Sequence, residues 1–426
     1  MFQEYLRQAM LLTHTTDKPS QLLHQDAKQL LRQNAISKTY NTDSDMQNFE
    51  FCNPTRLVFG KGQIARLATL IPTNAKVLVT FGGGSVKQNG VYDQVKEALR
   101  QHDHVEFWGI EPNPAIETLR KAIKLGIEEN VTYLLAVGGG SVLDGTKLIA
   151  SALTHPELDA WELVKKGYSK TYLPFASVMT LPATGSEMNS GAVISCKTLQ
   201  EKFAFYSTYP QFSILDPEVT YTLPPHQVAC SLADIFVHVM EQYMTTPGQS
   251  RVMDRWAEGI LQTVIEIAPL LKADPTNYDL RCDYVLSATL ALNDMIRMGV
   301  TQDWATHMIG HELTALLGVT HGESLAMVHT ALLTVLQEQK RTKLLQYAER
   351  VWHLTNGDED QLISQAITLT KSFFQSLGLR TSLSEAGAGK EIIDTISQRF
   401  IERGAHFGEL KNVDGEMARR ILEKAL

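Results

Sequence analysis

At 426 residues the chain is too long for one ordinary hydrophobic core, so two domains of roughly 200 residues each are expected. Hydrophobic residues make up 44% and charged residues 20% of the chain, which is typical of a globular enzyme. The formal net charge of −8 argues against a nucleic-acid partner, because phosphate binding needs a concentrated basic surface.

Residues 1–45 differ in character from the rest of the chain. Leucine pairs at 22–23 and 30–31 with polar residues between them allow an amphipathic helix, flanked by loop-like stretches. The acidic Glu4 close to Arg7, without a clean apolar stretch, argues against a secretory signal. The segment is either a peripheral extension of unknown role or a translated region upstream of a true start at Met46.

From residue 51 the pattern is strand, glycine turn, helix, strand. Strands are predicted at 76–81, 105–109, 132–137 and 175–181. The segment 191–196 is expected to extend the sheet and 213–216 to close it. Helices are predicted from the first glycine turn through Leu99, over 116–129 and over 143–153. This order is typical of parallel βαβ units, so we predict an α/β domain with a parallel sheet over 46–222.

After two prolines at 224–225 the pattern changes to long helical periodicities with almost no β-rich runs. The clearest helices are predicted at 254–271, 281–293, 303–317 and 344–354. We therefore place the domain boundary near residue 222 and predict an all-helical second domain over 223–426.

The four cysteines are scattered and form no CxxC pair, so the sequence predicts neither a disulfide framework nor a thiolate zinc site. This usage indicates a reducing compartment, and we expect a cytoplasmic protein. No apolar run approaches the roughly 18 residues that span a bilayer, so no membrane partner is expected.

Two glycine turns, each ending in serine, follow predicted strands. In the second, Gly139 and Gly140 lack Cβ atoms, so backbone N–H groups can approach a phosphate, and the helix start and Ser141 add donors. Asp144 follows one turn later, where its carboxylate could reach a ribose or nicotinamide group. The alternatives are that the glycines only tighten the turn and that Asp144 only stabilises the helix start.

The first turn bears on cofactor choice. NAD-selective folds usually place a carboxylate near the adenosine ribose, and it would repel a 2′-phosphate. Here Gly83, Gly84 and Ser85 leave room and donors instead, and Lys87 brings positive charge nearby. The sequence therefore predicts a preference for NADP(H).

Two helical segments carry a candidate metal site. Asp234 and His238 are four residues apart and share one helix face, and His307 and His311 repeat this spacing, with His321 following. Three imidazoles and one carboxylate suit a single divalent ion such as Zn²⁺ or Fe²⁺. Each pair could instead be an ordinary hydrogen-bonded pair, and the spacing alone does not decide which of His307 and His311 binds metal.

The chain resembles the iron-containing (group III) alcohol dehydrogenase family, in particular its NADPH-dependent butanol dehydrogenase and broad-range aldehyde reductase branch. The resemblance covers residues 46 to 426. The segments that carry it are 54–60 (PTRLVFG), 109–114 (GIEPNP), 136–147 (AVGGGSVLDGTK), 180–187 (TLPATGSE) and 302–314 (QDWATHMIGHELT).

This resemblance implies a dinucleotide-binding α/β domain followed by a helical metal-binding domain, as in dehydroquinate synthase-like folds. It implies that the metal ligands are Asp234, His238, His307 and His321. His311 then lies near the nicotinamide, either for proton relay and substrate positioning or as a hydrogen-bonded neighbour of the metal site.

The resemblance also implies further cofactor contacts and a homodimer. Thr180 and Thr184 would line the cofactor diphosphate and nicotinamide, and Asn189 and Lys202 would contact its ribose. The expected activity is metal-assisted hydride transfer between NADP(H) and short- to medium-chain aldehydes or primary alcohols.

Alternatives to this activity also follow from the resemblance. Polyol dehydrogenases and sugar-phosphate cyclising synthases share the two-domain plan, although the segments 109–114 and 302–307 disfavour them. A catalytically silent nucleotide- or metal-binding module is the alternative from another class. One local departure is expected as well: Gly310 and Gly322 stand next to metal-site histidines where relatives often carry larger residues, which predicts a looser local pocket.

Overall fold

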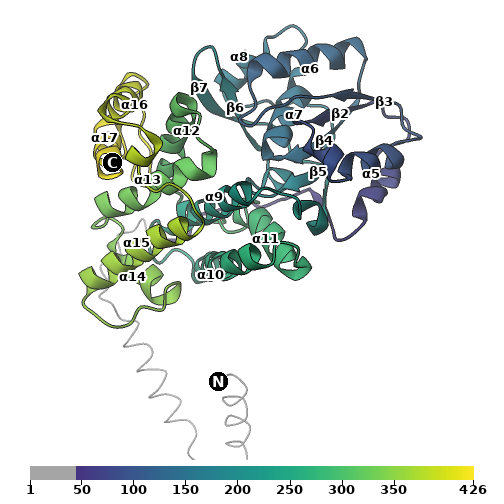
Figure 1. Cartoon of the computed structure of the whole chain (residues 1–426). Coiled ribbons are helices and arrows are strands. Elements are labelled where there is room, and N and C mark those ends of the chain that lie inside the picture. The colour runs from purple at the N-terminus through teal and green to yellow at the C-terminus, as the bar shows by residue number, and fades with distance from the viewer. Residues whose placement is uncertain (1–44) are drawn as a thin grey trace, which may run out of the picture. The chain divides into compact units, whose positions relative to one another are not determined.

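The structure is a computed structural model that describes residues 45–426, and residues 46–426 form one compact unit. The helix predicted near the leucine pairs at 22–23 and 30–31 lies outside the described residues. In Figure 1 the first half of the described chain forms a layered sheet structure, and the second half is built of helices.

A six-stranded parallel sheet forms the centre of the first half, with strand order β1-β8-β5-β4-β2-β3. Its strands are β1 (Arg56–Phe59), β2 (Val77–Phe81), β3 (His104–Phe107), β4 (Tyr133–Gly139), β5 (Phe175–Leu181) and β8 (Phe212–Leu215). β2, β4 and β8 are apolar and buried along nearly their whole length, as expected for strands that are covered on both faces.

Helices cover both faces of this sheet. They are α3 (Leu67–Leu70), α4 (Ser85–Gln88), α5 (Val91–Ala98), α6 (Ile116–Glu128), α7 (Gly140–Ala152) and α8 (Ala160–Lys166). Successive residues of β2 point to opposite faces: Val77 and Val79 pack in one core with α5, whereas Leu78 packs in another with α6 and α7 (Figure 1). The glycine turns therefore lie at the carboxyl edge of the sheet, where ligands bind in such folds.

Three details differ from the expectations drawn from the sequence. The helix after the first glycine turn is broken into α4 and α5, because Gly90 adopts a left-handed φ of 79°. The strand expected at 191–196 does not extend the main sheet: β6 (Gly191–Cys196) pairs antiparallel with β7 (Glu201–Tyr206) in a separate two-stranded sheet. β8 lies inside the sheet, between β1 and β5, and does not close its edge.

The second half consists of helices around α9 (Pro225–Tyr243). Pro225 starts α9 at a position where its missing N–H leaves no bond unmade, and from Val228 onward every residue of the helix is buried. α9 packs against α10, α11 and α13. The other helices are α10 (Arg251–Ala273), α11 (Tyr278–Ala291), α12 (Ala305–Leu317), α13 (His321–Val335), α14 (Arg341–Arg350), α15 (Glu359–Ser376), α16 (Lys390–Glu402) and α17 (Gly415–Lys424).

The change from sheet to helices falls between the short η5 (Pro217–Thr220) and α9. The fold class predicted from the sequence, a parallel-sheet domain followed by a helical domain, is therefore confirmed. Across residues 45–426, none of the helices combines the length and the apolar character needed to span a membrane.

Candidate metal centre and cofactor cleft

Three acidic and imidazole side chains project from one face of the central helix α9. Asp234, His238 and Glu241 follow one another at intervals of four and three residues, which places them on adjacent turns of the same face. All three are buried. A helix that is otherwise apolar in this region thus presents a single polar stripe.

Two further imidazoles reach this stripe from a helix–turn–helix. His307 stands in the first turn of α12, and His321 is the first residue of α13. Gly318, with a left-handed φ of 68°, ends α12 and allows the chain to turn into α13 within three residues. The turn therefore brings His321 back toward His307.

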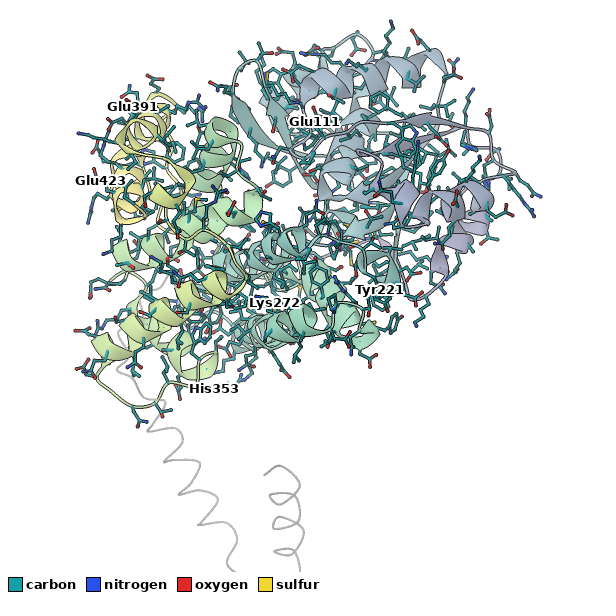
Figure 2. All side chains as sticks on the ribbon, viewed as in Figure 1. Glu111, Tyr221, Lys272, His353, Glu391 and Glu423 are labelled. Atoms are coloured by element: carbon teal, nitrogen blue, oxygen red, sulfur yellow. The ribbon has the colours of Figure 1, made fainter. Side chains whose placement is uncertain are left out.

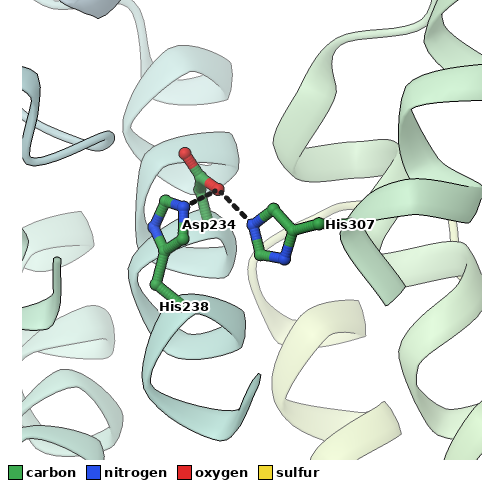
Figure 3. A group of neighbouring side chains, drawn as sticks. All are labelled: Asp234, His238 and His307. Atoms are coloured by element: carbon green, nitrogen blue, oxygen red, sulfur yellow. Dashed lines mark ion pairs between the residues drawn. The ribbon is translucent and has the colours of Figure 1, made fainter. Parts of the chain in front are cut away.

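The imidazoles surround one oxygen of Asp234. Its Oδ1 atom lies 3.5 Å from Nε2 of His238, 3.6 Å from Nε2 of His307 and 3.7 Å from Nε2 of His321. Figure 3 shows Asp234 between His238 and His307, and one ligand atom from each of these three lies within 4.8 Å of the others. Ligands about 2.0 to 2.1 Å from a tetrahedral ion stand about 3.3 to 3.5 Å apart, close to these distances.

Two of the converging atoms have no hydrogen-bond partner within the described chain. Oδ1 of Asp234 and Nε2 of His307 are buried and unsatisfied. Buried polar atoms are rarely left without a partner unless an ion or water completes them. Asp234, His238 and His307 therefore fit a divalent cation, and His321, whose Nε2 also lies 3.7 Å from Oδ1 of Asp234, stands beside this group of three.

The electrostatics of the bare cluster distinguish its histidines. Burial alone would lower the pKa of His307. Asp234 and Glu241 outweigh this effect through their hydrogen bonds to the imidazole and their negative charges, and they raise the pKa to about 9. Burial lowers the pKa of His238 to about 4. Burial, followed by the charge of Lys202, holds the pKa values of His311 and His321 well below the ordinary value. Of these histidines, His307 is therefore the one whose imidazole holds a proton at neutral pH.

Two residues beside this cluster were not singled out from the sequence. Oε1 of Glu241 accepts hydrogen bonds from the backbone N–H of His307 at 2.9 Å and from its Nδ1 at 3.2 Å. This bond fixes the imidazole so that Nε2 faces Asp234. Trp304, with a left-handed φ of 68°, places its ring centroid 5.2 Å from that of His307. The signal for Glu241 was present, because it follows His238 by three residues on the same helix face.

The expectation of a looser pocket at the two glycines is wrong. A Cβ atom at Gly322 would lie 2.0 Å from the backbone oxygen of Cys230, and one at Gly310 would lie 2.9 Å from Leu325. The absence of a side chain at Gly322 lets the first turn of α13 approach α9 closely. These glycines therefore tighten the packing that positions His321.

The residues predicted to bind cofactor at the second glycine turn lie where β4 enters α7, at the register shift between Gly138 and Gly139. A Cβ at Gly140 would lie 2.4 Å from Oγ1 of Thr184, so this glycine lets the 180–187 loop approach. Ser141 Oγ accepts a hydrogen bond from the backbone of Asn113. These glycines allow close internal packing, which is compatible both with a turn that binds phosphate and with glycines that only tighten the turn.

Asp144 and Asn189 are engaged with the protein itself. The two oxygens of Asp144 accept hydrogen bonds from Ser186 Oγ and from the backbone N–H of Val193. Asn189 Oδ1 accepts from Lys147 Nζ, and its Nδ2 donates to the backbone oxygens at 184 and 292. Both side chains hold the loop that follows β5 and contains Thr184, whereas Thr180 lies in β5 itself. The predicted cofactor contacts of Asp144, Asn189, Thr180 and Thr184 remain predictions.

That loop is also tied to the metal helix. Ser231, one turn before Asp234 on α9, donates a hydrogen bond to the backbone oxygen of Pro182, and Tyr284 of α11 donates to Ser231 Oγ. The cofactor loop and the candidate metal centre are thus connected through direct contacts between the two halves of the unit.

Lys202 lies between the sheet and the metal cluster. It stands on β7, which packs against α12, and Nζ donates a hydrogen bond to Oδ1 of Asn113 at 2.9 Å. Burial lowers its pKa to about 8, and the charges of Asp144 and Asp234 oppose this shift. Within the described part of the chain its ammonium group makes this one hydrogen bond, so further donors remain for a ligand.

The first glycine turn opens on a cavity of about 490 Å³, lined by Gly82, Gly83, Gly84, Lys87, Trp108 and neighbouring residues. Cβ atoms at Gly83 and Gly84 would meet nothing within 4 Å, in contrast to the packed glycines of the second turn. Ser85, also predicted to donate to the cofactor, begins α4 at the same place. This turn has the room for a ligand that the sequence predicted.

Comparison with known proteins identifies the family. The model of the iron-containing alcohol dehydrogenase family matches residues 54–217, and that of the family's C-terminal region matches residues 228–426. The chain belongs to the iron-containing alcohol dehydrogenase family.

Curated relatives of this dehydrogenase cover nearly the same part of the chain. The NADPH-dependent aldehyde reductase YqhD of Escherichia coli K12 is 52% identical over 386 residues, which are 89% of this chain and 100% of that protein. The probable NADH-dependent butanol dehydrogenase 1 of Bacillus subtilis 168 is 39% identical, over 89% and 100% of the two chains. Relatives named for NADPH and for NADH thus both occur.

Solved structures of the family agree with the fold described above. The crystal structure of E. coli K-12 YqhD is similar with a TM-score of 0.88 at 51% identity, covering 90% of this chain and 100% of that one. An NADH-dependent butanol dehydrogenase A from Thermotoga maritima has a TM-score of 0.84 at 34% identity, covering 89% and 99%. The family predicted from the sequence motifs is therefore confirmed.

In this alcohol dehydrogenase a group of ion pairs joins α16 to β7 and to α12, the helix that carries His307 and His311. Glu312, the residue after His311, accepts hydrogen bonds from Arg399 and Arg403 of α16. Arg399 also donates to the backbone oxygen of Gln200, and Arg403 lies 3.8 Å from Glu201. We call these five residues the Glu312 cluster. It links His311 and Lys202 through their immediate chain neighbours.

Proposed function

We propose that the protein reduces short- to medium-chain aldehydes to primary alcohols with NADPH, and catalyses the reverse oxidation, using one divalent metal ion. The observation that carries this proposal is the convergence of three imidazole Nε2 atoms on the unpaired Oδ1 of Asp234, at 3.5 to 3.7 Å. The aldehyde reductase YqhD, 52% identical, supports the substrate class and the cofactor.

The proposed ligands are Asp234, His238, His307 and His321. When bound, a Zn²⁺ or Fe²⁺ ion would supply Lewis-acid polarisation of the substrate oxygen, and the nicotinamide would supply or accept hydride. The family name favours iron, and the ligand set accepts both metals. Glu241 holds His307 in the orientation that directs Nε2 at the site.

On the cofactor side, we assign residues 46–222 as the dinucleotide-binding domain and 223–426 as the metal-binding domain. Lys202 would donate to the ribose from β7, because its ammonium group retains unused donors and β7 packs against α12, which carries His307. The open first turn at Gly83–Ser85, with no carboxylate side chain in the turn, supports a preference for NADP(H) over NAD(H).

His311 is the candidate for moving a proton at the substrate oxygen. Its ring centroid lies 5.2 Å from that of His321, and its low pKa keeps the imidazole neutral at neutral pH. A neutral imidazole has one donor and one acceptor nitrogen, so it can pass a proton without carrying a charge into the site. We further propose that the protein is a homodimer, as the family resemblance implies, and that it is cytoplasmic, as its cysteine usage indicates.

The test is a metal-replacement assay with an aldehyde panel. The purified protein is stripped with a chelator, reloaded with Fe²⁺ or Zn²⁺, and followed by NADPH oxidation with short aldehydes. We expect activity to vanish on stripping and to return with one equivalent of metal. Asp234→Ala and His307→Ala should lose at least about a hundredfold in turnover together with bound metal, because Lewis-acid polarisation supplies several kcal/mol.

His353→Ala is the matched control, because His353 is an exposed histidine beyond α14 on the outer surface of the helical part (Figure 2). It should retain both metal and activity. Full activity of the stripped protein, or of Asp234→Ala, would contradict the proposed metal chemistry. No NADPH oxidation with any aldehyde in metal-replete protein would contradict the proposed reaction, and phosphate release from a sugar phosphate would point to the cyclising-synthase alternative.

A further inference from the structure

The cavity at the first glycine turn has an aromatic wall made by Trp108. The indole stacks on Phe81 with ring centroids 4.0 Å apart and an interplanar angle of 10°. Its Nε1 donates a hydrogen bond to Oε2 of Glu106 at 2.8 Å, and Tyr92 packs edge-on against it at 5.3 Å while donating to the same carboxylate. The orientation of the indole is therefore fixed from three sides.

Lys87 covers the remaining face of that indole. Its Nζ lies 4.0 Å from the ring centroid of Trp108, and since Phe81 occupies one face, the ammonium group stands over the other. A cation in this position is attracted by the ring quadrupole. The lysine side chain, whose Nζ also lies 5.5 Å from the ring centroid of Tyr92, is thereby held at the rim of the cavity beside Gly83 and Gly84.

The charge of Lys87 is not neutralised by a neighbour. Within residues 45–426 no carboxylate lies within 4.0 Å of its Nζ, and Glu106 is engaged by Tyr92 and Trp108. Lys87 is exposed and lines the cavity. An unpaired cation that is already positioned beside an open glycine turn suits a phosphate better than a hydroxyl group.

We propose that Trp108 is a positioning residue that holds Lys87 for the 2′-phosphate of NADP(H), so that this pair sets the preference for NADP(H). The inference rests on the proposed function for the identity of the nucleotide. Ordering a flexible lysine on binding reduces affinity, and a lysine that the indole has already ordered avoids most of that loss. The effect of Trp108 should therefore exist only for ligands with a 2′-phosphate and only when Lys87 is present.

The test is calorimetric binding of two probes that lack nicotinamide: adenosine 2′,5′-bisphosphate and 5′-AMP. Lys87→Met should weaken the bisphosphate roughly tenfold or more, as loss of a charge-assisted hydrogen bond does. Trp108→Leu should weaken it roughly two- to fivefold, the size of an exposed cation–π contact. Neither variant should change binding of 5′-AMP, and the double variant should be no weaker than Lys87→Met.

Two further variants guard the interpretation. Trp108→Phe keeps an aromatic face and should bind the bisphosphate nearly as the parent does, so a folding defect in Trp108→Leu would not leave the idea without a test. Lys96→Met removes an exposed lysine of α5 that does not line this cavity and should leave the binding of both probes unchanged.

Three results would overturn the proposal. Equal weakening of both probes by Trp108→Leu would make the indole a platform for the base or a structural residue. A Trp108 effect that persists in the Lys87→Met background would show that it does not act through the lysine. No binding of either probe to the parent protein would remove the nucleotide from this cavity. Because the probes require no catalysis, these results are distinct from failure of aldehyde reduction, which would abolish turnover with NADPH and NADH alike.

Discussion

Replacing Glu241 tests whether the bond between this carboxylate and His307 prepares the metal centre. Glu241→Leu removes the acceptor of two hydrogen bonds, at 2.9 and 3.2 Å, and leaves the His307 ring free to rotate. Loss of such a supporting partner typically weakens metal binding 10- to 100-fold, or about 1.4 to 2.7 kcal/mol. Glu241→Gln keeps an acceptor oxygen and should fall at the lower end of that range.

A second effect of the same substitution has the opposite sign. The His307 pKa of about 9 means that a proton occupies the metal-free site at neutral pH and must leave when metal binds. Apparent affinity should therefore rise about tenfold per pH unit up to about pH 9 and then level off. Removing Glu241 lowers this pKa, so at pH 7.5 the relief of proton competition, up to about 30-fold, offsets the lost orientation.

The assay is a competitive chelator titration with Zn²⁺ or Co²⁺ at several pH values. We expect the variants to bind more weakly than the parent on the high-pH plateau, and their affinity to level off at a lower pH. Glu258→Gln changes another buried carboxyl of the helical half, bonded to Tyr243 and Gln346, and should leave the profile unchanged. Identical plateaus and identical break points for Glu241→Leu and the parent would refute the reasoning.

Three shorter predictions concern the packing and the cleft. Gly322→Ala should lower the melting temperature and the metal content of the protein, because the new Cβ would lie 2.0 Å from the backbone oxygen of Cys230. The control Gly259→Ala, in open space on α10, should stabilise the protein by up to about 1 kcal/mol. An unchanged metal content in Gly322→Ala would contradict this reasoning. Glu312→Gln should raise KM for NADPH with metal retained, while Asp394→Asn, which breaks an exposed pair, should not; equal KM values would count against an effect of the cluster on the cleft. His311→Ala should reduce turnover at full metal occupancy, and an unchanged pH–rate profile would argue against a proton role.

The sequence predicted the metal site in part by helix geometry and in part only by resemblance. The spacing of Asp234 and His238 places both on one face of α9, and the structure has them there. The spacing did not show which of His307 and His311 binds the metal, because the two residues lie one turn apart on the same face of α12. The structure directs Nε2 of His307 to within 3.6 Å of Asp234, and it places the His311 ring beside His321.

What the sequence did not predict depends mainly on contacts between distant segments. The pairing of β6 with β7 away from the main sheet follows from their antiparallel register, which the apolar run at 191–196 does not encode. Gly322 fits tightly against Cys230 because α13 packs against α9, and this contact between distant segments cannot be recognised in the local sequence. The small residue therefore suggested a looser pocket. The break at Gly90 is different: the Asn89–Gly90 pair is a turn signal that was available.

The Glu312 cluster has a practical consequence for altering this enzyme. α16 begins 69 residues after His321 in the sequence, so mutagenesis libraries restricted to the sequence neighbourhood of the metal ligands would omit Arg399 and Arg403. Yet these two arginines contact Gln200 and Glu201 at the start of β7, and both bind Glu312, the α12 residue next to His311. Engineering for bulkier aldehydes or for faster product release should therefore randomise α16 together with the residues around the metal, since Arg399 and Arg403 connect the β7 end at Gln200 and Glu201 to the residue next to His311.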